Sequence, residues 1–270
     1  MLHQIQGSDE ANNSNYNKRE ENMLPSHAAS PAIEYYKSFE ENLKKERDPL
    51  ISMNTPVIEK VITILRQEVK QWQVPIITLI AQTKNDPYRV FMGTILSLRT
   101  KDQVTANACE KLFKEADTPE KMLKLSEKHI QKLIYPVGFY KVKAKNIRDI
   151  SERLIREYHS KVPDEIEELL KFHGVGRKTA NLVLTEGYKK PAVCIDVHNH
   201  RILNRLGYLK TKTPHETEFV IREKLPQKYW IELNYLLVAH GQHICVPISP
   251  KCSQCPVNKY CERIGVTKSR

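Results

Sequence analysis

The 270-residue sequence has little glycine, few cysteines and no long apolar run. Nine glycines and the absence of any Asn-Gly pair disfavour a fold built on tight β-hairpins. No uninterrupted apolar stretch is long enough to cross a bilayer, and the N-terminus lacks the basic-then-apolar pattern of a secretion signal. Six cysteines are too few for a disulfide scaffold. We therefore expect an intracellular protein of a reducing compartment, with no membrane partner.

Charge is abundant but unevenly placed. The formal net charge is +11. Residues 1–50 carry six basic and nine acidic side chains, so that residues 51–270 carry 37 and 23, a net of +14. A charge of this size favours a polyanionic partner, although a basic protein without such a partner would look the same. Residues 1–50 are polar and have no apolar period, and we interpret them as a disordered extension.

Helical periodicity dominates the rest of the chain. Apolar residues recur at helical spacing from Val57 to Val69, and an amphipathic stretch runs from Lys141 to Tyr158. Helix starts are marked by a capping side chain, in most cases before a proline, at Thr55-Pro56, Asp86-Pro87, Thr118-Pro119, Ser126 and Thr213-Pro214. Glu216 would complete a capping box with Thr213. Because alternating strand patterns are few, the sequence predicts an all-α fold of about ten helices.

Four of the six cysteines lie near the C-terminus, at Cys245, Cys252, Cys255 and Cys261. Their spacing, C-x6-C-x2-C-x5-C, differs from the paired short clips of most zinc sites. One short C-x2-C flanked by wider gaps suits a bulky cubane, so we predict a [4Fe–4S] cluster. A four-thiolate zinc site and incidental thiols stay open as alternatives. We expect Cys109 and Cys194 to be buried and reduced.

A second motif joins two apolar helices through a short glycine turn, in the segment FHGVGRKTA at 172–180. Gly174 and Gly176 allow backbone angles that other residues resist, and they let main-chain N–H groups approach a ligand closely. These groups lie at a helix N-terminus, which favours phosphate. With Val175 and Arg177 they form the predicted grip on one DNA strand. A plain helix–helix turn is the alternative, which the basic remainder of the chain makes less attractive.

Lys178, directly after the turn, is the candidate nucleophile. An ordinary lysine with a pKa of about 10.4 is neutral in only about one molecule in 2,500 at pH 7. A helix N-terminus and a neighbouring cation such as Arg177 favour the neutral amine, which can then form a Schiff base. Asp196 lies 18 residues further on and could return beside the lysine. Each has a simpler interpretation, Lys178 as a solvated lysine or phosphate contact and Asp196 as a helix N-cap.

Taken together, these motifs resemble the endonuclease III family of helix-hairpin-helix DNA glycosylases. The resemblance rests on GVGRKTA, on Ile-Asp-Val-His at 195–198 and on the cysteine loop, and it covers Thr55 to about Ile264. Segments that start at Ser97, Ile134 and Leu236 look most like the eukaryotic thymine-glycol branch. The resemblance implies double-stranded DNA in a cleft between two domains. These are a six-helix barrel at 80–190 and a cluster domain of 55–79 and 191–264, followed by a tail at 265–270.

The resemblance also implies the chemistry. The enzyme would be a bifunctional DNA glycosylase/AP lyase that removes oxidised pyrimidines and cuts abasic sites by β-elimination, with Lys178 as nucleophile and Asp196 as catalytic carboxylate. Arg99, where many relatives have Gln, would fill the gap left by the flipped base, or would only contact phosphate. Phe139 stands at the family's wedge position, unless it is an ordinary core aromatic. We expect a monomer, in the cytoplasm or nucleoid of a prokaryote or the nucleus of a eukaryote.

Other functions stay open. A monofunctional mismatch glycosylase would lack a lysine at the hairpin position, so Lys178 argues against it. A non-catalytic iron–sulfur protein that binds DNA would keep the cluster and the hairpin but would not cut the strand. A ferredoxin-like electron carrier would have no need of the hairpin.

Overall fold

The computed structural model describes residues 55–72, 74–84 and 86–270, all of which belong to one compact unit. These residues contain helices and no strand, so the all-α prediction is confirmed. Over the same ranges, no helix combines the length and apolar character that a membrane span needs. The predicted disordered extension at 1–50 lies outside the described residues.

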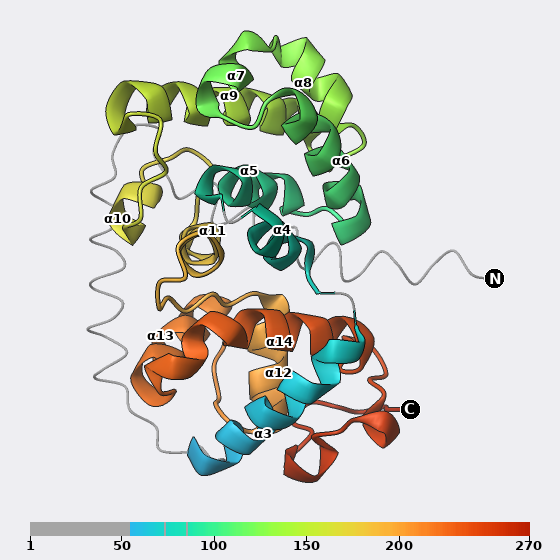
Figure 1. Ribbon diagram of the computed structural model, residues 1–270. Helices are drawn as coiled ribbons and strands as arrows, with labels where there is room; N and C mark the ends of the chain where they lie inside the picture. Colours follow the sequence, from blue (N-terminus) through green and yellow to red (C-terminus); the bar gives the residue numbers. More distant parts are fainter. Residues whose placement is uncertain (1–54, 73, 85) are drawn as a thin grey trace, which may run out of the picture. The chain divides into compact units, whose positions relative to one another are not determined.

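Twelve α-helices follow one another through mostly short connections in the described part of the chain (Figure 1). They are α3 (Thr55–Glu68), α4 (Ile76–Lys84), α5 (Pro87–Ser97), α6 (Asp102–Glu115), α7 (Pro119–Lys124), α8 (Glu127–Ile134), α9 (Tyr140–Tyr158), α10 (Ile166–Leu169), α11 (Arg177–Leu182), α12 (Val197–Leu206), α13 (Pro214–Lys224) and α14 (Trp230–His243). A π-helical segment, η2 (Val183–Gly187), continues α11. Short 3-10 turns are η1 (Val69–Gln71), η3 (Gln227–Tyr229), η4 (Cys252–Gln254) and η5 (Asn258–Tyr260).

The predicted helix starts follow from local capping chemistry. Backbone N–H groups two or three residues on donate to the side chains of Asp86, Thr118 and Ser126. Thr213 caps α13 by accepting from Glu216 N at 3.1 Å. The Glu216 carboxylate, however, accepts from Lys212 N at 2.7 Å. The cap at Thr213 is therefore confirmed, but the reciprocal half of the box reaches the residue before it.

Two large apolar clusters hold the described residues together. The first is built from α5 to η2 and draws its buried residues from Tyr88 to Ala192. The second combines α3 with α12, α13 and α14, and Figure 1 shows α3 lying against this C-terminal group. Consecutive residues, Ala192 and Val193, belong to different clusters, so the connection into α12 leads from one core to the other. The division into domains at 80–190 and at 55–79 with 191–264 stays a prediction.

The two cysteines outside the C-terminal loop are buried, as predicted. Cys109 is 3% exposed and Cys194 is 1% exposed. Burial raises the pKa of the Cys109 thiol to about 12 and that of Cys194 further still. Both therefore stay protonated and unreactive at neutral pH.

Candidate active site and iron–sulfur site

The glycine turn before α11 positions Lys178. Gly174 has a φ of +73°, a conformation that favours glycine, and a Cβ there would lie 2.5 Å from Asn146 Nδ2, so that side chain would have to move. Gly176 differs from the sequence-based expectation, because its φ of −94° is open to any residue. A Cβ on Gly176 would meet nothing within 4 Å. The backbone there is therefore open to close approach, while Gly174 alone is required by the turn.

Asp196 returns to the lysine because the chain after η2 runs back along α11. Cys194 Sγ lies 3.6 Å from the carbonyl oxygen of Lys178, which ties the two segments together. Lys178 Nζ and Asp196 Oδ2 are 3.9 Å apart. The lysine side chain is 49% exposed, whereas that of Asp196 is 9% exposed. An accessible amine therefore stands beside a nearly buried carboxylate.

The two oxygens of the Asp196 carboxylate have different surroundings. Oδ1 accepts from His198 N at 2.8 Å and from Asn199 N at 3.0 Å, which caps α12. In return Asn199 Oδ1 accepts from Asp196 N at 3.1 Å, completing a capping box. Oδ2 is the oxygen that faces Lys178. Asp196 is thus a helix cap through one oxygen, and the other is directed to the amine.

Arg177 turns its guanidinium away from the turn and into the protein. Its Nη2 lies 2.7 Å from Glu218 Oε1, and its guanidinium carbon stands 4.9 Å from the ring centre of Phe219. Burial alone would raise the pKa of Glu218, but hydrogen bonds and charges from Arg177 and Arg222 hold it below its ordinary value. The Glu218 carboxylate thus compensates the Arg177 charge within the protein. Val175 is likewise buried, at 3% exposure, so the side chains of both residues are largely covered by the protein.

Arg99 and Phe139 lie on two adjacent turns, one before α6 and one before α9. Both residues adopt a left-handed backbone, with φ of 53° and 56°. The Arg99 guanidinium carbon is 5.4 Å from the ring centre of Phe139. Phe139 is 61% exposed, so the alternative that it is an ordinary core aromatic is wrong. The two side chains form an exposed cation–π pair.

A set of residues on α12 was missed by the sequence reasoning. Arg201 donates to the carbonyl oxygen of Cys245 (Nη2, 2.8 Å) and contacts His198 Nδ1 (3.1 Å). Arg205, one turn further, donates to Val246 O at 2.8 Å. The helix that Asp196 caps therefore also fastens the start of the cysteine loop. The i, i+4 spacing of two arginines directly after Asp-Val-His-Asn-His was the available signal.

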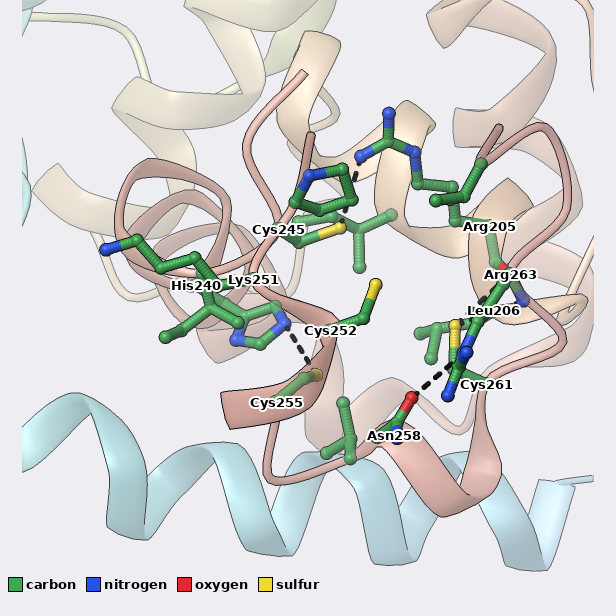
Figure 2. A pocket seen from close by; sticks show the side chains of 15 residues that line it. Arg205, Leu206, His240, Cys245, Lys251, Cys252, Cys255, Asn258, Cys261 and Arg263 are labelled. Atoms are coloured by element: carbon green, nitrogen blue, oxygen red, sulfur yellow. Dashed lines mark hydrogen bonds between the residues drawn. The ribbon is translucent and has the colours of Figure 1, made fainter. Parts of the chain in front are cut away.

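The four C-terminal cysteines line one pocket with apolar residues of α12 and with His240 (Figure 2). Its empty space is about 390 Å³, the open mouth included. Arg205 Nη1 lies 3.5 Å from Cys245 Sγ, and Arg263 N donates to Cys261 Sγ at 3.4 Å. Burial raises the pKa of the Cys255 thiol to about 11, and the neighbouring cysteines add to the effect. Metal binding requires thiolates. A cationic centre in the pocket would stabilise the thiolate forms of these cysteines, which burial alone disfavours.

The spacing of these thiols separates a cluster from a single ion. A zinc ion would draw four sulfurs to about 2.3 Å from one point. Among the described residues, no group of three or more His, Cys, Asp or Glu side chains is close enough to hold one metal ion. A cubane binds one thiolate at each iron corner and so fits four sulfurs spread around a wider space. The pocket, lined by all four cysteines, therefore fits an iron–sulfur cluster, and four thiols that share one pocket are not incidental.

Comparison with known proteins decides the family. A model described as "HhH-GPD superfamily base excision DNA repair protein" matches residues 92–227, and one described as "Iron-sulfur binding domain of endonuclease III" matches residues 245–261. Endonuclease III of Thermotoga maritima is 46% identical over 179 residues, which are 66% of this chain and 84% of that protein. The chain belongs to the endonuclease III family.

More distant relatives and solved structures agree. Endonuclease III-like protein 1 of Mus musculus is 40% identical over 178 residues, which are 65% of this chain and 59% of that protein. Endonuclease III homolog 2 of Arabidopsis thaliana is also 40% identical, and the match spans 48% of its length. A structure titled "Structure of a non-covalent Endonuclease III-DNA Complex" superposes with a TM-score of 0.70 at 25% identity, covering 78% of this chain and 96% of that one.

Membership in the endonuclease III family gives the activity class and the cofactor. This family member is a DNA glycosylase and AP lyase of base excision repair. Its C-terminal cysteines carry a [4Fe–4S] cluster, so the cofactor prediction is confirmed. The roles of individual side chains stay predictions.

Proposed function

We propose that this endonuclease III-family enzyme removes oxidised pyrimidines from double-stranded DNA and cleaves abasic sites through a Schiff base on Lys178, with Asp196 as the catalytic carboxylate. The supporting observation is the 3.9 Å separation of Lys178 Nζ and Asp196 Oδ2, with Oδ1 held by two backbone N–H groups. This distance is longer than a hydrogen bond. Catalytic contacts in unliganded enzymes are often loose and tighten when substrate binds.

The chemistry begins once the damaged nucleotide has left the stack, which costs a few kcal/mol. Asp196 Oδ2 accepts a proton from the Lys178 ammonium. The amine lone pair then forms the Nζ–C1′ bond while the C1′–N bond to the base breaks. The electron pair of the broken bond leaves with the base, which takes up a proton. Oδ2 passes the proton it has accepted to the departing base, and the negative charge restored on Oδ2 stabilises the positive charge that develops on the sugar.

Strand cleavage follows from the same bond. Opening of the sugar ring gives an iminium between Nζ and C1′. Loss of a proton from C2′ expels the 3′ phosphate by β-elimination. Water then hydrolyses the iminium, which frees Lys178 and leaves an unsaturated aldehyde on the 5′ fragment. Lys178 thus acts in both base removal and strand cleavage.

DNA is held mainly by its phosphates. The main chain at Gly174–Arg177 contacts one strand. The open space around Gly176 and the net charge of +14 on residues 51–270 support this contact. The exposed pair of Arg99 and Phe139 enters the duplex at the flipped base. When bound, the cluster cross-links the four cysteines and stabilises the C-terminal loop. Figure 2 shows Arg205 and His240 beside that loop.

Borohydride trapping tests the proposal. The full-length protein is mixed with duplexes that contain thymine glycol, dihydrouracil, uracil, a mismatch or an abasic site, and the imine is reduced to a stable amine. We expect covalent complexes with the oxidised pyrimidines and the abasic site, and none with Lys178→Gln. Lys171→Gln, which removes a lysine paired with Glu168 elsewhere on the surface, serves as the charge-matched control.

Other results would point to other functions. Base release without a trapped complex would indicate a monofunctional glycosylase. Binding without base release or cleavage would indicate a non-catalytic DNA-binding protein. We further propose that the enzyme acts as a monomer, which sedimentation with and without DNA tests, and that it works in the cytoplasm or nucleoid of a prokaryote or the nucleus of a eukaryote.

A further inference from the structure

A buried ammonium group lies beneath the turn that carries Arg99. Lys143 on α9 is 6% exposed, and no carboxylate among the described residues pairs with it, which is unusual for a lysine. Its Nζ donates to Leu96 O at 2.9 Å, to Leu98 O and to Thr100 Oγ1 at 3.2 Å. These acceptors follow one another from the last turn of α5 into the turn before α6. Lys143 therefore holds that turn from below, over the whole stretch that includes Arg99.

The Lys143 ammonium keeps its charge although it is buried. Burial, with a smaller contribution from the Arg99 guanidinium, lowers the pKa of Lys143 to about 8. The group is therefore still mostly protonated at pH 7. The acceptors that face it from α5 and from the 98–100 turn are uncharged, and in the described part of the chain Arg99 is the charged group that acts on it. An apolar side chain would fill the same space but would leave these oxygens without a donor.

The Thr100 hydroxyl connects the Lys143 ammonium to the second turn. It accepts from Lys143 Nζ and from Gly138 N, each at 3.2 Å, and donates to Leu98 O at 3.2 Å. Gly138 directly precedes Phe139. A Cβ on Gly138 would stand only 2.7 Å from the carbonyl oxygen of Arg99, so the two turns are in backbone contact. The turns before α6 and α9 therefore share one hydrogen-bonded centre.

Both exposed residues of the pair need such support. Arg99 and Phe139 are in the left-handed region, which side chains other than glycine adopt only when their surroundings hold them there. The centre formed by Lys143 and Thr100 reaches the turn of each. Without it, each turn could relax separately, and the 5.4 Å cation–π contact would be lost.

We propose that Lys143 is a positioning residue which, through Thr100, locks Arg99 and Phe139 into one unit that recognises the site of a missing base. The inference rests on the proposed function, in which this pair enters the duplex. The buried Lys143 ammonium is bound by protein oxygens and takes no part in the proposed Lys178 chemistry. Its loss should therefore weaken recognition of the lesion without removing the Lys178 amine.

The test uses binding and not turnover, so that it is independent of the Lys178 chemistry. The full-length, cluster-loaded protein is titrated with two duplexes, one that contains a tetrahydrofuran abasic analogue and one that is undamaged. The measured quantity is the ratio of the two affinities. Lys143→Met removes the ammonium and keeps the apolar stem. Lys145→Met is the matched control, because it removes the same charge from a side chain 68% exposed on the same helix.

A second matched pair changes only the hydroxyl. Thr100→Val removes it at nearly constant shape, and Thr100→Ser keeps it. We expect Lys143→Met and Thr100→Val to lower the affinity ratio by about 10-fold to 100-fold, since a displacement of about 1 Å can have an effect of that size. Lys145→Met and Thr100→Ser should stay within about 2-fold of the unmodified protein, well below the effect of such a displacement. If these residues were needed only for folding, the affinity ratio would fall together with thermal stability. The ratio would then not depend on whether the residue at position 100 carries a hydroxyl.

Several results would overturn the inference. These are an unmodified protein with no preference for the abasic duplex, or Lys143→Met and Thr100→Val variants that match their controls. If Lys143→Met does not fold, the Thr100 pair decides alone. The proposed function fails by a different result, the absence of trapping at an abasic site, so the two failures are distinguishable. Intact trapping in Thr100→Val together with a reduced affinity ratio would support both.

Discussion

Replacing Asp196 by alanine and by asparagine separates its role as a helix cap from its role as a carboxylate. Alanine removes the acceptor of His198 N and Asn199 N at a position only 8% exposed. Loss of an N-cap costs about 0.5–2 kcal/mol, and donors left unsatisfied in a buried site add about 1–3 kcal/mol. For a folded unit of this size each kcal/mol corresponds to about 2–4 °C in Tm. Asp196→Ala should therefore lower the Tm by about 3–20 °C.

Asparagine keeps the cap but not the charge. Asn is as good an N-cap as Asp, and its Oδ1 can accept the same two N–H groups. Asp196→Asn should therefore stay within about 0.5 kcal/mol of the unmodified protein. What it lacks is the negative Oδ2 that lies 3.9 Å from Lys178 Nζ. Because a positioned acid–base group contributes about 10²–10⁴-fold to rate, excision should fall by at least about 100-fold in both variants.

The assays are thermal melting by circular dichroism at one scan rate, and single-turnover excision of thymine glycol with enzyme in excess. Iron content is measured on each preparation, so that cluster loss is not mistaken for loss of the carboxylate. Two results would refute the reasoning. Asp196→Asn with nearly full excision would leave the residue as a cap alone. Asp196→Asn as unstable as Asp196→Ala would contradict the division of labour between Oδ1 and Oδ2.

Three further predictions concern Arg99, the cluster and a partly buried histidine on α13, His215. Arg99→Gln should flatten a preference for excision opposite guanine of up to about 1–3 kcal/mol, expected because guanine O6 and N7 accept two hydrogen bonds from arginine. Trapping at abasic sites should persist, and an equal loss opposite all four bases would instead indicate a phosphate contact. Purified protein should be yellow-brown with about four irons per chain, and stoichiometric zinc would contradict the cluster. The pKa of His215 is lowered to about 4, mainly by burial. The unfolded chain binds this proton near pH 6.5, so the free energy of unfolding should fall as the pH is lowered from 6.5 to 4. His215→Gln should remove on the order of 1–2 kcal/mol of that fall.

Local signals in the sequence predicted the elements of this fold well. The caps at Asp86, Thr118, Ser126 and Thr213 involve atoms two or three residues apart, so the sequence contains both partners. The all-α class, the buried cysteines and the [4Fe–4S] cluster are confirmed for the same reason, since periodicity and cysteine spacing are short-range properties. Gly174 follows this rule, because a tight turn demands it. Gly176 does not, because its ordinary φ could not be read from the letters alone.

Pairings between distant segments were beyond the sequence. The ion pair of Arg177 with Glu218 joins residues 41 positions apart, so the sequence alone could not show it. The buried Lys143 looked like one more lysine on an amphipathic helix, because its acceptors lie 43 to 47 residues away. The exposure of Phe139 likewise depends on which neighbours fail to cover it.

The sequence alone determined which reactive groups this enzyme has: an amine after a glycine turn, a carboxylate at a helix start and four thiols at cluster spacing. The tertiary structure decided how they are used. It places Lys178 beside Asp196 through the chain segment that Cys194 ties to α11, and it joins the Arg99 and Phe139 turns at Thr100. The physical reason is range. Capping and periodicity act within one or two helical turns, whereas the distance between two side chains on separate helices is set by the packing of the cores between them.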